Sequence, residues 1–463
     1  MFKTFINAWK VKDIRTKMLF TLLLIVIYRF GSFIPIPGVN AAALNAQIEQ
    51  YDLLGFLNLF SGGSLSQFSL FAMGISPYIT GSIIVQLLTI AIPALEKLSK
   101  EDDGRQKIEK ITRYVGVGLA AVQSLTIITT LQNVARSQNG TSILNTIQLF
   151  KSAGANNVIT YIVIAICCTA GTAFLMWMGE RITEKGVGNG ISMLIFASII
   201  ASIPNVFVKI FRYWEILPWH SIMAYTDAEG TTRFGVLKWW APIVALIVTL
   251  VLIVGICLVD RAVRRIPVQY AKRVVGRKLY GGQSTHIPMK ANANGVMPLI
   301  FAMTLLQVPA MIAQFWGTNS AGFPKFVNTY FSPSTNNPLG VIIYYVLYGL
   351  LIIGFAYFYS SISFNPVEIS KNLQQNGGFI PGIRPGKPTS DYLQKKSSRL
   401  TMFGALYLCL IAIIPSILLK VLGIDLLSRF GATSVLIMVS VALETAEQLD
   451  SLLLMRHYKG FLG

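Results

Sequence analysis

The sequence has little charge and few histidines, and each scarcity excludes a class of protein. Charged residues make up 13% of the 463 residues, against about 25% in typical soluble domains. Such a chain would not stay soluble as a compact globule. The histidines, His220, His286 and His457, are too far apart to suggest a metal-ligand spacing or a Ser/His/Asp triad. We therefore expect no metal centre, no catalytic residue and no enzyme activity.

Cysteine is also scarce, and a nucleotide-binding loop is missing. A P-loop has the pattern Gly, four residues, Gly-Lys-Ser/Thr, but Pro381 and Pro388 occupy two of these positions around Lys387. The glycine-rich stretch 186–190 joins two apolar runs, which indicates a tight turn. We expect no cofactor. The cysteines lie in apolar runs and indicate small buried side chains rather than disulfides: Cys167, Cys168, Cys257 and Cys409.

Long apolar runs separated by short polar loops dominate the chain, and 53% of its residues are hydrophobic. A bilayer core needs about 20 apolar residues per helix, and lipid offers no partners to backbone groups, so each run must be helical. The sequence predicts an all-α membrane protein with ten transmembrane helices. The expected spans are 18–37, 70–92, 114–135, 157–178, 190–208, 239–259, 296–316, 340–363, 400–419 and 433–449.

The basic residues alternate along the chain, because most Lys and Arg fall in every second gap between the runs. Lys and Arg in short loops stay on the cytoplasmic side, so both termini, 1–17 and 450–463, are expected there. The net charge is +19. A basic inner face suits anionic lipid or an acidic partner such as ribosomal RNA; orientation of the chain alone is the alternative explanation.

Two pairs of runs resemble each other, which indicates an internal repeat. The stretch 74–79 has Gly, Pro and a final Ile at the same positions as 295–300, and 192–195 matches 434–437 in its Ser, Leu and Ile. These are the second and seventh runs and the fifth and tenth. Because five is odd, the second copy enters the membrane inverted, and inverted repeats place a functional path at their interface. The expected halves are 18–208 and 239–449, joined by an outer connection at 209–238.

Three segments do not fit the spans. The segment at about 53–71 is apolar but too short to cross a bilayer, and Ser61-Gly62-Gly63-Ser64 breaks it. It is either an interfacial helix or a movable stopper in a central cavity. The loops 260–293 and 364–399 combine basic residues with turn signals and are interpreted as docking surfaces. In the first loop Ile266 to Tyr270 has strand character, and Gly276 or Gly281-Gly282 is placed to close a hairpin.

Four motifs together resemble the SecY family, which forms the central subunit of the bacterial protein-conducting channel. The resemblance runs essentially end to end, and the form of the last motif is bacterial rather than archaeal or eukaryotic. The motifs are Gly74-x-x-Pro77-Tyr78-Ile79, the loop from Gly186 to Ser192, Gln283-Ser284-Thr285-His286-Ile287-Pro288, and Pro381-Gly382-Ile383-Arg384-Pro385-Gly386.

The resemblance implies two inverted five-helix halves in a clamshell around a central pore, with these residues at its working parts. The implied pore ring is Ile75, Ile79, Ile191, Ile195, Ile300 and Ile437. The implied plug includes Leu57, Phe60, Ser61, Gly62, Gly63 and Ser64, and a lateral gate includes Thr80, Gln123 and Thr304. Docking of a motor or ribosome is implied for Arg264, Arg265, Lys272, Arg273, Arg277, Lys278, Arg384 and Lys387.

The family resemblance also implies the function. Unfolded secretory or membrane proteins, led by signal peptides, pass through the bacterial plasma membrane, and hydrophobic segments leave sideways into lipid. The implied partners are SecE, SecG, the SecA ATPase and the ribosome. Two alternatives remain: an inverted-repeat secondary transporter of small solutes, and a membrane scaffold without a pore. Arg29, Glu444 and Glu447 lie near span ends, and the scarcity of ionisable residues in mid-span argues against ion coupling.

Overall fold

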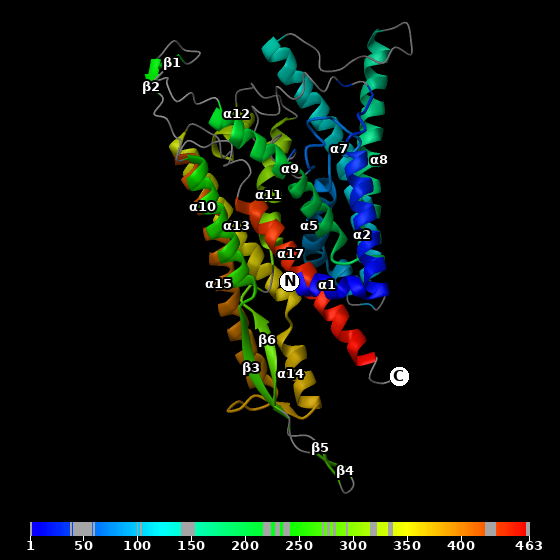
Figure 1. Cartoon of the computed structure of the whole chain (residues 1–463), viewed down its shortest axis with the longest axis vertical. Coiled ribbons are helices and arrows are strands. Elements are labelled where there is room, and N and C mark those ends of the chain that lie inside the picture. The colour runs from blue at the N-terminus through cyan, green and yellow to red at the C-terminus, as the bar shows by residue number, and fades with distance from the viewer. Residues whose placement is uncertain are drawn as a thin grey trace.

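Long helices run along the molecule, and the largest sheet lies at one end of it (Figure 1). The computed structural model describes residues 2–37, 39, 58, 61–99, 101, 104–139, 153–215, 224–226, 232–234, 241–270, 273–275, 278–280, 284–292, 295–314, 322–331, 337–421 and 432–459.

Each apolar run expected to span the membrane coincides with one long helix. Two ends were predicted wrongly: α2 stops at Gly31, where Pro35 and Pro37 follow, because proline lacks the N–H that a helix interior needs. Residues 70–75 form turns before α5, since Gly74 has a φ of 57°, which a helix cannot contain. The helices are α2 Lys12–Gly31, α5 Ser76–Ala91, α7 Gly104–Asn139, α8 Ala153–Lys185, α9 Gly190–Glu215, α10 Ala241–Asp260, α11 Met297–Gln314, α13 Pro338–Ser363, α15 Lys387–Val421 and α17 Ala432–Lys459.

Length and composition qualify only part of these helices as membrane spans. Among the described residues, four segments are long and apolar enough to cross a membrane. The expected ten-span architecture therefore remains a prediction. The four segments are Gln106–Thr129, Val158–Lys185, Pro338–Gln375 and Lys387–Leu418, and shorter apolar helices cover Ser76–Ala91, Gly190–Pro204, Leu246–Asp260 and Met297–Ala310.

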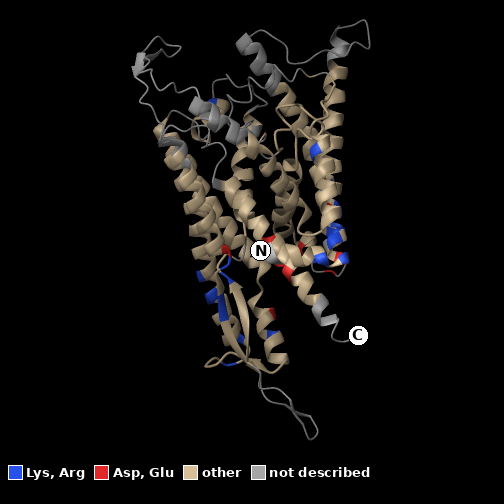
Figure 2. Cartoon of the chain, viewed as in Figure 1, with Lys and Arg blue, Asp and Glu red and all other residues tan. Residues whose placement is uncertain are grey.

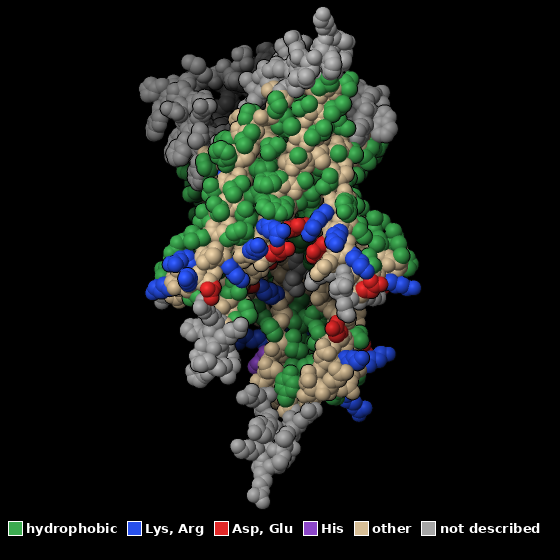
Figure 3. Space-filling model, turned by 90° about the vertical axis from the view of Figure 1, so that its right-hand side faces the viewer, with side chains coloured by type: hydrophobic (Ala, Val, Ile, Leu, Met, Phe, Trp, Pro, Cys, Tyr) green, Lys and Arg blue, Asp and Glu red, His purple; other side chains and the backbone are tan. Residues whose placement is uncertain are grey.

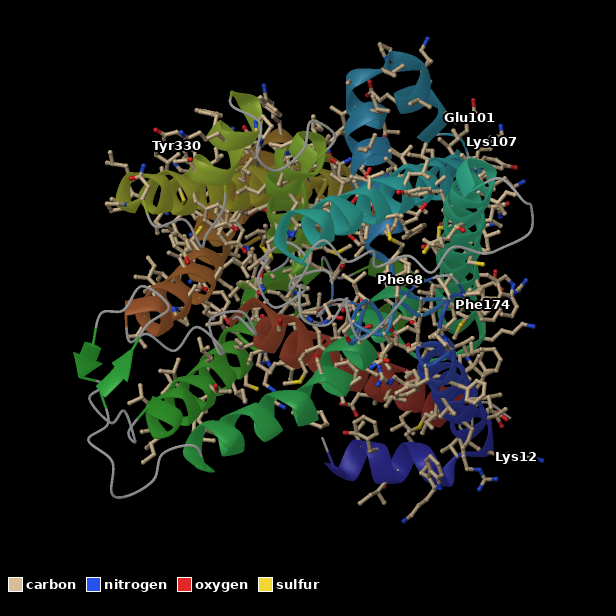
Figure 4. The ribbon with its side chains drawn as sticks, turned by 90° about the horizontal axis from the view of Figure 1, so that it is seen from above. Lys12, Phe68, Glu101, Lys107, Phe174 and Tyr330 are labelled. Atoms are coloured by element: carbon tan, nitrogen blue, oxygen red, sulfur yellow. The ribbon has the colours of Figure 1, made fainter. Side chains whose placement is uncertain are left out.

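Four short helices lie near the ends of the long ones in the described part of the chain. The first, α1 Phe2–Lys10, lies across the long helices rather than along them (Figures 1 and 4). Its buried Ala8 packs in a cluster with Leu449 of α17, while Ile6 and Trp9 are exposed. The others are α6 Pro93–Ser99, α12 Phe323–Tyr330 and α14 Pro366–Gln375.

The two charged loops, 260–293 and 364–399, form one structural unit. Strands β3 Val263–Tyr270, β6 Ser284–Lys290 and β7 Gly378–Phe379 make a sheet in the order β6-β3-β7. The predicted strand at 266–270 is confirmed: it lies in β3, which pairs antiparallel with β6. Buried side chains from both loops share one core that includes Val268, Ile380 and Leu393. The smaller pairs are β1 Ala224–Thr226 with β2 Thr232–Phe234, and β4 Arg273–Val275 with β5 Lys278–Tyr280.

Charge and apolar surface are segregated. The described charged residues gather toward the end that carries the β3–β6 sheet and are sparse along the helical body (Figure 2). Apolar side chains cover the body above a band of charge (Figure 3), and Leu22, Leu250, Val346 and Leu410 are examples on four helices. Such a belt is what a bilayer would cover.

Candidate functional site

Five of the six isoleucines expected in the pore ring belong to one apolar cluster inside the helical body. Ile195 of α9, Ile300 of α11 and Ile437 of α17 are its buried members, at 4%, 7% and 1% exposure. Ile79 of α5 and Ile191 of α9 are partly buried and pack against them. Four helices, two from each half of the chain, thus meet through branched aliphatic side chains. We call this set the isoleucine cluster.

The sixth predicted member, Ile75, lies next to this cluster rather than within it. It precedes α5 and packs with Tyr28 and Phe71 in an adjoining buried cluster. Ile79 and Ile191 contact both clusters. The two groups therefore form a continuous apolar layer, and Ile75 supports its edge on the side of α2.

Sequence reasoning missed two members of the isoleucine cluster. Ile199 and Val441 are 0% and 4% exposed and belong to the same group. Each follows a predicted member, Ile195 or Ile437, by four residues, so it lies one turn further on the same helix face. This spacing could have revealed them. The cluster is thus more than one turn deep along α9 and α17.

The side chains of the cluster are all apolar: they are aliphatic residues, methionines and Phe196. A narrow apolar collar excludes water and hydrated ions. Dispersion contacts are weak one by one and have no preferred direction. The members can therefore separate in small steps without breaking a particular bond.

The segment 61–64, which we call the plug segment, accepts hydrogen bonds from two side chains of α2, and one of these side chains is bonded in turn to α9. The Tyr28 hydroxyl of α2 donates to the Ser61 carbonyl at 3.1 Å and shares a 2.6 Å hydrogen bond with the hydroxyl of Ser198 on α9. Arg29 donates from Nη1 to the Gly62 carbonyl at 3.0 Å. Arg29, which the sequence placed near the end of the first span, thus has a backbone acceptor in the plug segment. Leu57 and Phe60, also predicted for the plug, lie outside the described residues.

Close packing adds to these bonds. Gly62 has a φ of +65°, and a Cβ there would lie 3.0 Å from the Ser198 Cα, so any other residue at this position would be strained. Beyond the plug segment, Leu65 and Phe68 are buried against Ile128 of α7 and other residues of α7 and α8. Seen from above, Phe68 lies among the helices, whereas Phe174 lies nearer the edge (Figure 4). The segment and its flank therefore fill space inside the bundle.

The three residues expected at a lateral gate lie on helices that meet. Helix α11, which carries Thr304, contacts both α5 and α7. Thr80 lies on α5 and Gln123 on α7. Thr80 donates to the Ser76 carbonyl at 3.0 Å and Thr304 to the Ile300 carbonyl at 2.8 Å. Both hydroxyls are thus bonded within their own helices, a common pattern for threonine. They mark the junction of the two expected halves without bridging it.

The predicted docking residues that the structure describes fully are exposed at the charged end. Arg264 and Arg265 lie on β3, and Arg384 and Lys387 lie where α15 begins. The turn of Arg384 is fixed, since its carbonyl accepts from Thr389 Oγ1 at 2.8 Å. Pairing of β3 with β7 brings the two loops together. Arg273 and Lys278 lie on β4 and β5, and their side chains, like Lys272 and Arg277 as a whole, are outside the described residues.

Comparison with known proteins gives one family. The sequence model of the SecY family matches residues 69–446. The protein translocase subunit SecY of Streptomyces coelicolor is 43% identical over 467 residues, covering 100% of both chains.

Solved structures agree in fold. A structure on the plug domain of the SecY protein, described as stabilising the closed state of the translocation channel and maintaining a membrane seal, has a TM-score of 0.62 at 17% identity. It covers 94% of this chain and 92% of its own. Sec61 in the canine ribosome-channel complex from the endoplasmic reticulum has a TM-score of 0.58 at 16% identity, covering 94% and 92%.

Proposed function

Because this chain belongs to the SecY family, we propose that it is a channel that passes unfolded polypeptides across a membrane. The observation that carries the proposal is the meeting of Ile79, Ile195, Ile300 and Ile437 from four helices in one buried apolar cluster. Such a cluster seals against ions yet yields to a threading chain, because no directional bond holds it. The family comprises protein translocase channel subunits and is not an enzyme family.

The architecture we propose is two inverted five-helix halves, 18–208 and 239–449, in a clamshell of ten spans. Local structure supports the repeat. Pro77 and Pro298 both lie in the first turn of their helices, α5 and α11, where a missing N–H costs little. Ile79 and Ile300 each follow that proline by two residues. Equivalent positions of the two halves thus supply the cluster, as an interface between inverted repeats requires.

Sideways release would occur between α5, α7 and α11. On insertion scales an apolar residue gains up to about 0.6 kcal/mol and a central arginine costs about 2.5–3.5 kcal/mol. A run of about 20 leucine-like residues therefore favours lipid by roughly 10 kcal/mol, whereas a polar segment continues across. Thr80, Gln123 and Thr304 would line this gate, and weak polar contacts between helices in membranes allow it to open.

We propose a bacterial plasma-membrane location with both termini cytoplasmic. The charged end would receive the SecA ATPase or a translating ribosome, SecE and SecG would associate as small subunits, and signal peptides would lead the substrates. The exposed Arg264, Arg265 and Arg384 support this, as does the solved ribosome complex of Sec61. Exposed Ile6 and Trp9 of α1, beside Lys10 and Lys12, suit an interface rich in anionic lipid. Replacing Arg384 by Glu should stop SecA-driven export and leave the fold intact.

Truncation of the isoleucine cluster tests the proposal. Ile195→Ala and Ile437→Ala should raise ion leakage through the purified protein in planar bilayers by about tenfold or more, because each leaves a cavity worth about 2–5 kcal/mol. Ile166→Ala is the matched control, since Ile166 of α8 is 63% exposed. Unchanged leakage in both cluster variants would reject the pore. Uptake of a small solute along an ion gradient would instead favour the transporter alternative.

A further inference from the structure

Docking at the charged end can open the channel only if the sheet is connected to the isoleucine cluster. We infer that the carboxylate of Asp260 is this connection, and that it links the two charged loops to the helix that carries Ile437. The inference rests on the proposed function. Asp260 is thus a positioning residue, which acts through α17 and touches no substrate.

One carboxylate joins three elements. Asp260 is the last residue of α10. Its Oδ1 accepts a hydrogen bond from Asn292 Nδ2 at 3.1 Å, and its Oδ2 accepts from Ser440 Oγ of α17 at 2.5 Å. Asn292 follows β6 by two residues and is 7% exposed. Hydrogen bonds to an ionised acceptor are stronger than neutral ones, so the sheet, α10 and α17 are held at one point.

The position of this carboxylate argues against a role in helix stability alone. The C-terminus of a helix carries partial negative charge, so an acidic residue there is disfavoured. Asp260 is at such a terminus, and the donors Asn292 and Ser440 offset the cost. A neutral residue would suit α10 better. The carboxylate is therefore explained by what it binds on other elements.

A second contact holds α17 further along the same face. Lys290, the last residue of β6, forms an ion pair with Glu447 at 2.5 Å. Glu447 follows Ser440 by seven residues, about two helical turns, so both lie on one face. Ile437 is three residues before Ser440. The helix is therefore held at two levels on the sheet side of its cluster residue.

Backbone hydrogen bonds and close packing tie the sheet to these contacts. β6 pairs with β3 from Ser284 to Lys290, and β3 pairs with β7. The Ala291 N–H donates to the Ala262 carbonyl at 2.8 Å. A Cβ on Gly404 of α15 would lie 3.1 Å from the Ala291 carbonyl oxygen, so α15 lies directly against this turn. Both charged loops, α15 and the Asp260 contacts are thus one connected body.

The experiment separates docking from opening. Purified full-length protein is placed in planar bilayers, empty bacterial ribosomes are added, and conductance is recorded while ribosome binding is measured by co-sedimentation. Ser440→Ala and Asp260→Asn should bind ribosomes as the wild type does. Their ribosome-induced rise in conductance should fall roughly tenfold, as the loss of a hydrogen bond to a charged group predicts. Ser451→Ala is the control, because Ser451 is exposed and its hydroxyl donates to the Glu447 carbonyl of its own helix.

The exposed ion pair provides a second test that does not disturb the interior. Lys290→Glu or Glu447→Lys alone should lower the ribosome-induced rise about twofold to threefold, and the double exchange should restore it, in keeping with the small strength of exposed ion pairs.

Three outcomes would overturn the inference. A wild-type response in both Ser440→Ala and Asp260→Asn would reject Asp260 as the connection and leave the proposed channel standing. Ribosomes that bind the wild type without changing its conductance would do the same, since docking would then not reach the cluster. Absence of conductance even from Ile437→Ala would reject the proposed channel and this inference together.

Discussion

The isoleucine cluster and the plug segment both lie inside the helical body, yet different forces hold them. The cluster is fixed by dispersion contacts among Ile195, Ile300, Ile437 and their neighbours. The plug segment is fixed by directional hydrogen bonds from Tyr28 and Arg29. Dispersion contacts are many and individually weak, so they are lost a few at a time, whereas each hydrogen bond is a single contact that is lost once its geometry fails. The cluster should therefore widen in steps, and the plug segment should leave in one.

The isoleucine cluster and the hydrogen bonds of the plug segment are linked through one helix, α9. Ile195 and Ser198 both lie on α9, three residues apart, and Ser198 is bonded to Tyr28. A movement of α9 as a whole would strain the Tyr28–Ser198 bond, whereas a change confined to one side chain of the cluster would leave this bond in place. Labelling of a buried reporter, Ser64→Cys at a position 1% exposed, reports plug release separately from ion leakage. The native cysteines lie within the long helices.

The largest effect is expected at Gly62. Gly62→Ala should raise maleimide labelling of the reporter about a hundredfold, because left-handed backbone costs about 1–2 kcal/mol and overlap with the Ser198 Cα adds about 1–3 kcal/mol. Gly63→Ala separates the two causes: Gly63 has a φ of +85° with nothing within 4 Å of its Cβ position. Gly63→Ala should therefore show the cost of the backbone conformation alone, which is a rise in labelling of about tenfold. Equal labelling of the two variants would mean that contact with α9 does not matter.

Removing the arginine should have the next largest effect. Arg29→Met keeps an unbranched side chain and removes a hydrogen bond from a charged donor, worth about 1.5–3 kcal/mol. Labelling of the reporter should rise about thirtyfold. Arg29→Lys, which keeps the charge, should fall between this variant and the wild type. If Arg29→Met labels like the wild type, the Gly62 carbonyl contact does not retain the plug segment.

Loss of the tyrosine hydroxyl should give a smaller rise. Tyr28→Phe removes the hydrogen bonds of the hydroxyl to the Ser61 carbonyl and to Ser198. Only the first of these reaches the plug segment, and it is worth about 0.5–1.5 kcal/mol, so labelling should increase about fivefold. Ser66→Ala is the matched control, because Ser66 Oγ donates to the Gly63 carbonyl within the same stretch of chain. A greater effect of Ser66→Ala would place the retaining force inside the segment itself.

The smallest effect should come from the isoleucine cluster and should affect a different measurement. Ile195→Val removes one methylene, at about 0.5–1.5 kcal/mol. It should raise ion leakage about threefold and leave reporter labelling unchanged. If labelling rises together with ion leakage, the cluster and the plug segment open as one unit. The two regions would then not respond independently.

Much of the fold followed from local pattern. The lengths of the apolar runs placed each long helix, and alternating strand character placed β3, because these signals depend on residues close in the chain. The exceptions also have local causes: Pro35 and Gly74 shorten the helices that hydropathy alone would extend. Strong hydropathy says where a helix lies but little about where it ends.

The candidate site was predictable in part. Ile195 and Ile437 were named from matched repeats and the family resemblance, while Ile199 and Val441, one turn further, were missed although their four-residue spacing was visible. The hydrogen bonds of Tyr28 could not be predicted from the sequence, since its partners Ser61 and Ser198 are 33 and 170 residues away. A tyrosine in an apolar run has no local signal for such a partner.

The sequence by itself determined which segments are helices, where polar loops interrupt the apolar runs, and in which of these loops the basic residues gather. These properties follow from residue type and short spacing, since hydrophobic burial and helix periodicity act locally along the chain. Only the tertiary structure decided that Arg29 reaches the Gly62 carbonyl and that Asp260 meets Ser440, 180 residues away. Such bonds depend on how helices pack, and packing is settled by the shapes of many side chains at once.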